Sequence, residues 1–266
     1  MKRLLALRWL PVYAAGAFAF LYLPLLVLAA FSFNSSKFTV WQGFSLRWYQ
    51  AAFADTQLSE ATANSLIIAF TATILSTAIG AACAYGLWKR TNRTLLGVVY
   101  LTLVTPEIVT GVSLLAFFEA FFRYLHARLG LHTVILAHIA FSVAYVVLVV
   151  LARLRTLDAR LEEAALDLGA TPWQAFREVT LPSILPAVVA AALLAFTVSF
   201  DDYVITSLVA GVGSETLPMV IYALARRGVN PVLNALSAMI FLGLGALVLI
   251  SQALTRRAET PGADTK

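Results

Sequence analysis

The stretch EAALDLG, residues 163–169, is the most informative part of this chain. Val179 follows ten residues after Gly169, and Leu181-Pro182 follows after one intervening residue, Thr180. The segment is polar and charged, and it separates two long apolar runs. Glycine gives the backbone the freedom to end a helix and reverse direction, and proline marks the start of a new one. The pattern therefore predicts helix, turn and helix between two apolar segments, with Glu162, Glu163 and Asp167 giving the first helix an acidic surface.

The composition is that of a membrane protein. Hydrophobic residues make up 61% of the 266 residues and charged residues 12%, whereas soluble domains have roughly 45–50% and about 25%. The net charge of +5 does not indicate nucleic acid, because the basic residues bracket apolar runs instead of clustering on a soluble face. The single cysteine, Cys83, lies inside an apolar run and is expected to pack there.

Apolar length predicts the number of membrane crossings. A bilayer core needs about 20 apolar residues per helix, and six stretches meet that length. We therefore predict an all-α polytopic membrane protein with six transmembrane helices. The first stretch runs beyond the apolar region of a signal peptide, so a retained anchor is expected. The six stretches are Trp9–Phe31, Ala61–Trp88, Thr94–Phe122, His132–Leu151, Leu181–Phe200 and Leu233–Leu254.

The basic residues predict the orientation. With a cytoplasmic N-terminus, thirteen of the nineteen lysines and arginines fall on inner segments and six on outer segments. Cytoplasmic loops of membrane proteins carry this excess. Both termini are therefore expected in the cytoplasm, together with residues 163–169. An external loop rich in aromatic residues would follow the first span, with a helix lying at the membrane interface.

The pattern E-A-A-x3-G-x9-V-x-L-P resembles the cytoplasmic loop of permease subunits of ATP-binding-cassette (ABC) importers, with Val179 in place of the usual isoleucine. In that family the loop forms a short helix that sits in a groove of the ATPase subunit. Independently, Thr171 and Pro172 suit the cap and first residue of a second helix. The resemblance implies that ATPase coupling rests on Glu163, Ala164, Ala165, Asp167, Gly169, Ala170, Thr171 and Pro172.

The resemblance extends over most of the chain and implies the type I importer permease fold. It implies an N-terminal helix and periplasmic aromatic loop over residues 1–60, the permease domain over 61–254 and a cytoplasmic tail over 255–266. Within the family the chain is similar to polyamine (spermidine/putrescine) permeases, although Glu107 stands where an aspartate is commoner. The similarity is carried by Phe33–Lys37, Pro106–Gly111, Ser199–Asp202, Thr216–Pro218, Gly228–Pro231 and Asn234–Leu236.

Three acidic residues are expected within the outer half of the membrane. Glu107 lies about thirteen residues, roughly 20 Å, into the third span, and Asp201 and Asp202 end the fifth. Ionisable groups at such depths are costly and are often functional. Carboxylates attract protonated amines, and Tyr203 could add a cation–π contact, so these four residues are the candidate substrate pathway.

Structural roles for the same acids stay open. Asp201 and Asp202 could cap the outer segment or pair with Arg226 and Arg227. Glu107 could hydrogen-bond a neighbouring helix. The apolar region over residues 204–220 is too irregular for a full span, and it could dip partway into the membrane as a gate.

The chain lacks the motifs of an enzyme. It contains no G-x-x-x-x-G-K-[ST] phosphate loop and no G-x-S-x-G motif. Its histidines, His126, His132 and His138, recur at six-residue spacing, which does not place them on one helix face. We therefore expect no metal site, no bound cofactor and no catalysis by this chain, so any ATP and Mg²⁺ would be used by a partner.

The resemblance implies a bacterial inner-membrane complex. Its members would be two ABC ATPase subunits, a second and different permease, and a periplasmic polyamine-binding protein. Transport would proceed by alternating access. The alternatives are the same machinery for iron or an organic cation, an ion-driven secondary carrier or channel, and a scaffold that transports nothing.

Overall fold

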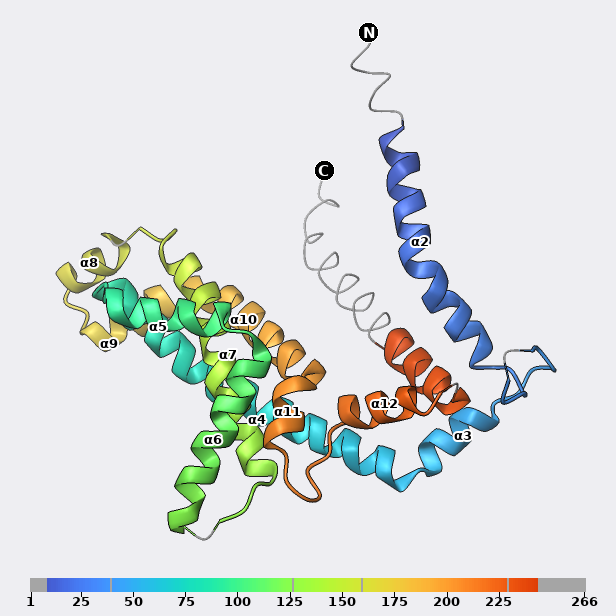
Figure 1. Cartoon of the computed structure of the whole chain (residues 1–266). Coiled ribbons are helices and arrows are strands. Elements are labelled where there is room, and N and C mark those ends of the chain that lie inside the picture. The colour runs from blue at the N-terminus through green and yellow to red at the C-terminus, as the bar shows by residue number, and fades with distance from the viewer. Residues whose placement is uncertain (1–8, 39, 126, 159, 229, 244–266) are drawn as a thin grey trace. The chain divides into compact units, whose positions relative to one another are not determined.

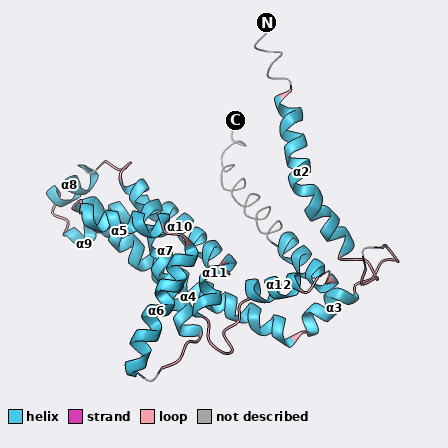
Figure 2. Cartoon of the chain, viewed as in Figure 1, coloured by secondary structure: helices cyan, strands magenta, loops and turns pink. Residues whose placement is uncertain are grey.

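The computed structural model describes residues 9–38, 40–125, 127–158, 160–228 and 230–243, which are mostly helical (Figure 2). The chain divides into two compact units. The central unit is Ser59–Val220, and the terminal unit combines the residues before and after it.

The central unit is a helical bundle with the polar elbow at one end (Figure 1). Its central helix is α7, which packs along α10. On α10, Ala191 and Ala195 are fully buried against α7, since small side chains let two helix backbones approach closely. The elements are α4 (Thr56–Lys89) from Ser59 onward, α5 (Arg93–Val104), α6 (Glu107–Leu125), α7 (Leu131–Leu154), α8 (Arg160–Asp167), α9 (Pro172–Ala175), the π-helix η1 (Phe176–Thr180), α10 (Leu181–Asp201), α11 (Val204–Val209) and the start of α12 (Leu217–Arg226), whose residues from Ile221 belong to the terminal unit.

Four helices are long and apolar enough to cross a membrane: Leu10–Phe31, Thr56–Lys89, Leu131–Leu154 and Pro172–Asp201. They confirm the first, second, fourth and fifth predicted spans. The sixth, Leu233–Leu254, is only partly described, as the helix Pro231–Gly243. Residues 244–254 and the expected tail over 255–266 lie outside the described residues.

The third predicted span, Thr94–Phe122, is not one helix. It consists of α5 and α6, which are bent by 110° relative to each other. The break falls at Thr105-Pro106, where Thr105 is extended with ψ 129°. The residue before a proline is driven out of the helical region, and proline itself has no backbone N–H to continue the helix. The expected irregularity at Pro106 is therefore a sharp corner.

The terminal unit contains α2 (Leu10–Phe31), α3 (Arg47–Ala54) and Pro231–Gly243. No residue of α2 is buried, which fits a helix surrounded by lipid or by another subunit. The loop after α2 is organised by Asn34, whose side chain accepts from Gln42 N at 2.9 Å and donates to Val40 O at 2.8 Å. The helix predicted in this loop is present as α3, and its place at the membrane interface stays a prediction.

Candidate functional site

The polar elbow between α7 and α10 has the predicted form. The helix α8 ends at Asp167, and Gly169 reverses the chain with φ +90°. Thr171 then caps α9, because its hydroxyl accepts from Gln174 N at 3.3 Å, and Pro172 is the first residue of that helix. Helix, glycine turn and helix are therefore confirmed.

The outer surface of the elbow combines acidic and apolar side chains. Glu163 and Asp167 are exposed, as predicted. Two large apolar residues beside them are exposed as well: Leu168 at 91% and Trp173 at 66%. The motif did not single these two out, because a side chain's exposure depends on where the elbow sits against the bundle. Exposed apolar side chains on a polar loop are typical of a surface that another protein covers.

Glu162 does not belong to this acidic surface, although its sequence context placed it there. It is only 5% exposed. Lys89 Nζ lies 2.6 Å from its Oε1, the Tyr85 hydroxyl donates to Oε1 at 3.0 Å, and the Thr180 hydroxyl donates to Oε2 at 2.7 Å. Burial by itself would raise the pKa of Glu162, but these donors, Lys89 first, hold that pKa below its ordinary value.

The contacts of Glu162 make a joint, which we call the elbow joint: Tyr85, Lys89, Glu162 and Thr180. It ties α8 to the end of α4 and to the π-helix η1. The sequence offered little signal for it, because Lys89 and Glu162 are far apart in the chain and lie in different helices.

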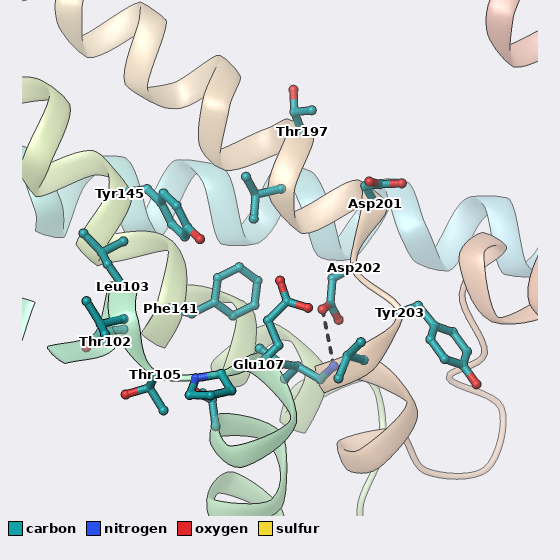
Figure 3. Close-up of a pocket in the computed structure, with 16 residues that line it drawn as sticks. Thr102, Leu103, Thr105, Glu107, Phe141, Tyr145, Thr197, Asp201, Asp202 and Tyr203 are labelled. Atoms are coloured by element: carbon teal, nitrogen blue, oxygen red, sulfur yellow. Dashed lines mark hydrogen bonds between the residues drawn. The ribbon is translucent and has the colours of Figure 1, made fainter. Parts of the chain in front are cut away.

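A cavity of about 670 Å³ opens where two helices are broken (Figure 3). One wall is the corner between α5 and α6, and the other is the join between α10 and α11. The two walls are close because Gly111 lets α6 approach α11: a Cβ there would meet Leu208 Cδ1 at 2.6 Å. Hydroxyls dominate its polar lining, from Thr102, Thr105, Thr110, Thr197, Tyr145 and Tyr203.

The structure places all four predicted pathway residues, Glu107, Asp201, Asp202 and Tyr203, on this cavity. Glu107 is exposed, and Figure 3 shows its carboxylate directed into the space beside Phe141. Asp201 is also exposed, at the end of α10, with its carboxylate turned away from Glu107 in this view. Within the described part of the chain, neither Glu107 nor Asp201 has a hydrogen-bond or ion-pair partner.

Asp202 differs from the other two acids because its carboxylate is buried and bonded. It accepts from Thr206 N at 2.8 Å and from Ile205 N at 3.3 Å, so it caps the first turn of α11. The capping role left open for this residue is confirmed. The region after it, residues 204–220, contains α11 and the start of α12 and not a complete span.

Beneath Asp202 lies a buried polar group that the sequence did not indicate. His138, on α7, is only 1% exposed. Its Nδ1 is 2.7 Å from Ser199 Oγ and its Nε2 is 2.9 Å from Thr206 Oγ1. A lone histidine in an apolar span gives no signal of its partners when they come from two other helices. Across the described residues, no group of three or more His, Cys, Asp and Glu side chains could hold a metal ion.

The sequence matches a known family and named relatives. Residues 76–259 match the family described as "Binding-protein-dependent transport system inner membrane component". The putrescine transport system permease protein PotI of Escherichia coli K12 is 42% identical over 262 residues, covering 94% of this chain and 92% of that protein. The spermidine/putrescine transport system permease protein PotC of Haemophilus influenzae is 39% identical over 244 residues, covering 90% and 93%.

Solved structures share the fold. A chain of a bacterial ABC transporter involved in the import of the acidic polysaccharide alginate matches with a TM-score of 0.76 at 20% identity, covering 96% of both chains. The MetNI methionine ABC transporter, in inward facing conformations, matches with a TM-score of 0.62 at 21% identity, covering 76% of this chain and 96% of that one. At these identities the likeness concerns the fold alone.

Proposed function

Because this chain belongs to the family of inner membrane components of binding-protein-dependent transport systems, we propose that it is the permease subunit of an ATP-driven polyamine importer. The relatives named as putrescine and spermidine/putrescine permeases support this solute class. The chain matches them over nine-tenths of its length, so the likeness includes the helices around the cavity.

The observation that carries the solute class is the free carboxylate of Glu107 in the cavity. A polyamine is a flexible chain with protonated amines, and charge-assisted hydrogen bonds to carboxylates are the strong ones. Glu107 and Asp201 supply negative charge that the described residues do not neutralise. The hydroxyls around them accept hydrogen bonds from ammonium groups, and the Phe141 and Tyr203 rings can face a cation.

The elbow would couple this chain to ATP hydrolysis. A partner ATPase would dock on α8 and α9 and cover Leu168 and Trp173, with Glu163 and Asp167 beside them. The rest of the coupling surface is Ala164, Ala165, Gly169, Ala170, Thr171 and Pro172. ATP and Mg²⁺ would be used by that partner, and this chain would bind no cofactor.

The remaining partners follow from the family. Two ATPase subunits, a second and different permease and a periplasmic polyamine-binding protein would complete the importer. The chain would lie in the bacterial inner membrane with both termini and the elbow in the cytoplasm, as the basic residues indicate. Alternating access would then expose the cavity to each side in turn.

The test is uptake of labelled putrescine and spermidine by the assembled complex in proteoliposomes, with the binding protein outside and ATP inside. We expect Glu107→Gln to lower uptake about tenfold, because one charge-assisted bond is lost. Glu107→Gln combined with Asp201→Asn should lower it further while the complex still assembles. Glu119→Gln is the matched control, because it makes the same change on the same helix outside the cavity.

Unchanged uptake in the double variant would remove the acids from the pathway. Uptake that persists without the ATPase would favour an ion-driven carrier. Unlabelled iron, a monovalent organic cation and spermidine can each be tested as competitors of labelled putrescine. If iron or the organic cation inhibits putrescine uptake more strongly than spermidine does, the same machinery carries another solute.

A further inference from the structure

We infer that His138 is a positioning residue for solute passage: it fixes Asp202 at the cavity wall, and Asp202 itself binds no cation. The inference rests on the proposed function and divides the three acids between two roles. Glu107 and Asp201 face the solute, whereas Asp202 ends a chain of hydrogen bonds that runs from Ser199 through His138 and Thr206. We call this chain the cavity joint.

With a neutral imidazole, the donors and acceptors of the cavity joint can point in only one direction. The Thr206 hydroxyl donates its single proton to Asp202 Oδ2 at 2.7 Å. It must therefore accept from His138 Nε2, which lies 2.9 Å away, so Nε2 carries the ring proton. Nδ1 is then free to accept from the Ser199 hydroxyl at 2.7 Å. Every bond is satisfied by one imidazole tautomer, without a second proton on the ring.

The carboxylate of Asp202 is occupied by these bonds. Oδ2 accepts from the backbone N–H and the hydroxyl of Thr206, Oδ1 accepts from Ile205 N, and His138 Nε2 lies 3.4 Å from Oδ2. The side chain is only 5% exposed. A solute ammonium would have to break bonds to bind here, whereas Glu107 and Asp201 offer exposed oxygens. Asp202 therefore holds the shape of the site, and Glu107 and Asp201 bind the ammonium groups of the solute.

The joint lies where a small displacement changes the cavity. Ser199 belongs to α10, His138 to α7 and Thr206 to α11, and all three side chains are buried. Val204 and Ile205, at the start of α11, line the cavity that Glu107 enters. Losing the bond between His138 and Thr206 frees the start of α11, and so moves this wall relative to Glu107. A shift of about 1 Å can cost a hundredfold in rate when geometry matters.

The test uses two neutral amides that differ in reach. In His138→Gln the amide nitrogen can occupy the place of Nε2 and donate to Thr206, whereas in His138→Asn it ends near the place of Nδ1, beside Ser199. In the complete complex we expect His138→Asn to lower uptake about tenfold per assembled complex, the worth of one hydrogen bond to a charged network. His138→Gln should restore uptake to within about twofold of the unmodified protein. Equal uptake in all three proteins would overturn the inference.

The solutes separate positioning from direct binding. His138→Asn and Asp202→Asn should lower putrescine and spermidine uptake by the same factor, because they move the wall for every solute. Glu107→Gln should alter the ratio between the two solutes, which carry different numbers of charges. If Asp202→Asn alters that ratio as Glu107→Gln does, Asp202 binds the cation and the inference is wrong. If Glu107→Gln changes neither the uptake of the two solutes nor their ratio, the proposed function is contradicted instead.

Discussion

Glu162 and Asp202 are both buried carboxylates that join three helical elements of the central unit, but their partners differ. Glu162 faces a cation, Lys89, whose own side chain is 42% exposed. Asp202 is bonded to backbone N–H groups, a threonine hydroxyl and, more distantly, the imidazole of His138, whose side chain is 1% exposed. The elbow joint is therefore an ion pair with one exposed partner, and the cavity joint is a directional chain of buried side chains.

The difference between an ion pair and a chain of hydrogen bonds fits the positions of the two joints, one at the elbow and one at the cavity wall. An ion pair depends weakly on angle and keeps much of its energy as the partners shift, since Coulomb attraction falls slowly with distance. Under the proposed function, such a contact suits an elbow that transmits movement. A chain of single hydrogen bonds weakens steeply once donors and acceptors misalign. Such a chain suits a wall that must hold one shape.

Lys89→Met should have the largest effect of the three changes described here. It removes the cation from a buried carboxylate and so destabilises the elbow by about 2 kcal/mol, a value set by charged hydrogen bonds and reduced for the exposure of Lys89. Lys89→Arg keeps the charge and should recover most of this loss. The measurement is the melting temperature of the purified complex together with uptake per ATP hydrolysed. If Lys89→Met melts like the unmodified protein, the ion pair does not hold the elbow.

The second-largest effect is expected from acid, which should weaken the elbow joint. The pKa of Glu162 is lowered below its ordinary 4.5 in the folded protein, so its contribution to stability is complete above that ordinary value. This contribution is lost as the pH falls through the lower, folded pKa. The melting temperatures of the unmodified protein and Glu162→Gln should therefore differ by a constant amount near neutral pH and converge below pH 4.5. A constant difference throughout this acid range would contradict the assignment.

Glu163→Gln should have the smallest effect on stability, within about 0.5 kcal/mol, because this neighbour of Glu162 is exposed. Under the proposed function it should nevertheless lower uptake per ATP, since Glu163 faces the docked ATPase. Thermal unfolding and uptake per ATP hydrolysed, measured for Glu163→Gln and Glu162→Gln, separate the effect on stability from the effect on coupling. Should Glu163→Gln and Glu162→Gln destabilise the complex equally, the distinction between the buried and the exposed acid would fail.

Local signals in the sequence were read correctly. Gly169, Thr171 and Pro172 act within a few residues of themselves, and each takes the predicted place in the turn or at the start of α9. Apolar length likewise identified four described spans, because burial in lipid depends on composition over about 20 residues. The predicted pathway acids reach one cavity because each follows directly on a helix break or a helix end.

Signals that depend on distant partners were missed. The opposite exposures of Glu162 and Glu163 follow from the direction in which α8 presents each side chain to α4 and η1. His138 looked like an isolated residue because Ser199 and Thr206 come from other helices. The corner at Pro106 was expected only as an irregularity, since the size of a bend depends on what packs on either side of it.

By itself, then, the sequence determined that this chain is a helical membrane protein with a polar elbow and with acids near its helix breaks. Composition and turn chemistry act locally, so no neighbouring helix is needed to read them. The tertiary structure alone decided which acids are free and which are bonded. That choice depends on hydrogen-bond partners brought within about 3 Å by helices far apart in the chain, and neither periodicity nor motif spacing records it.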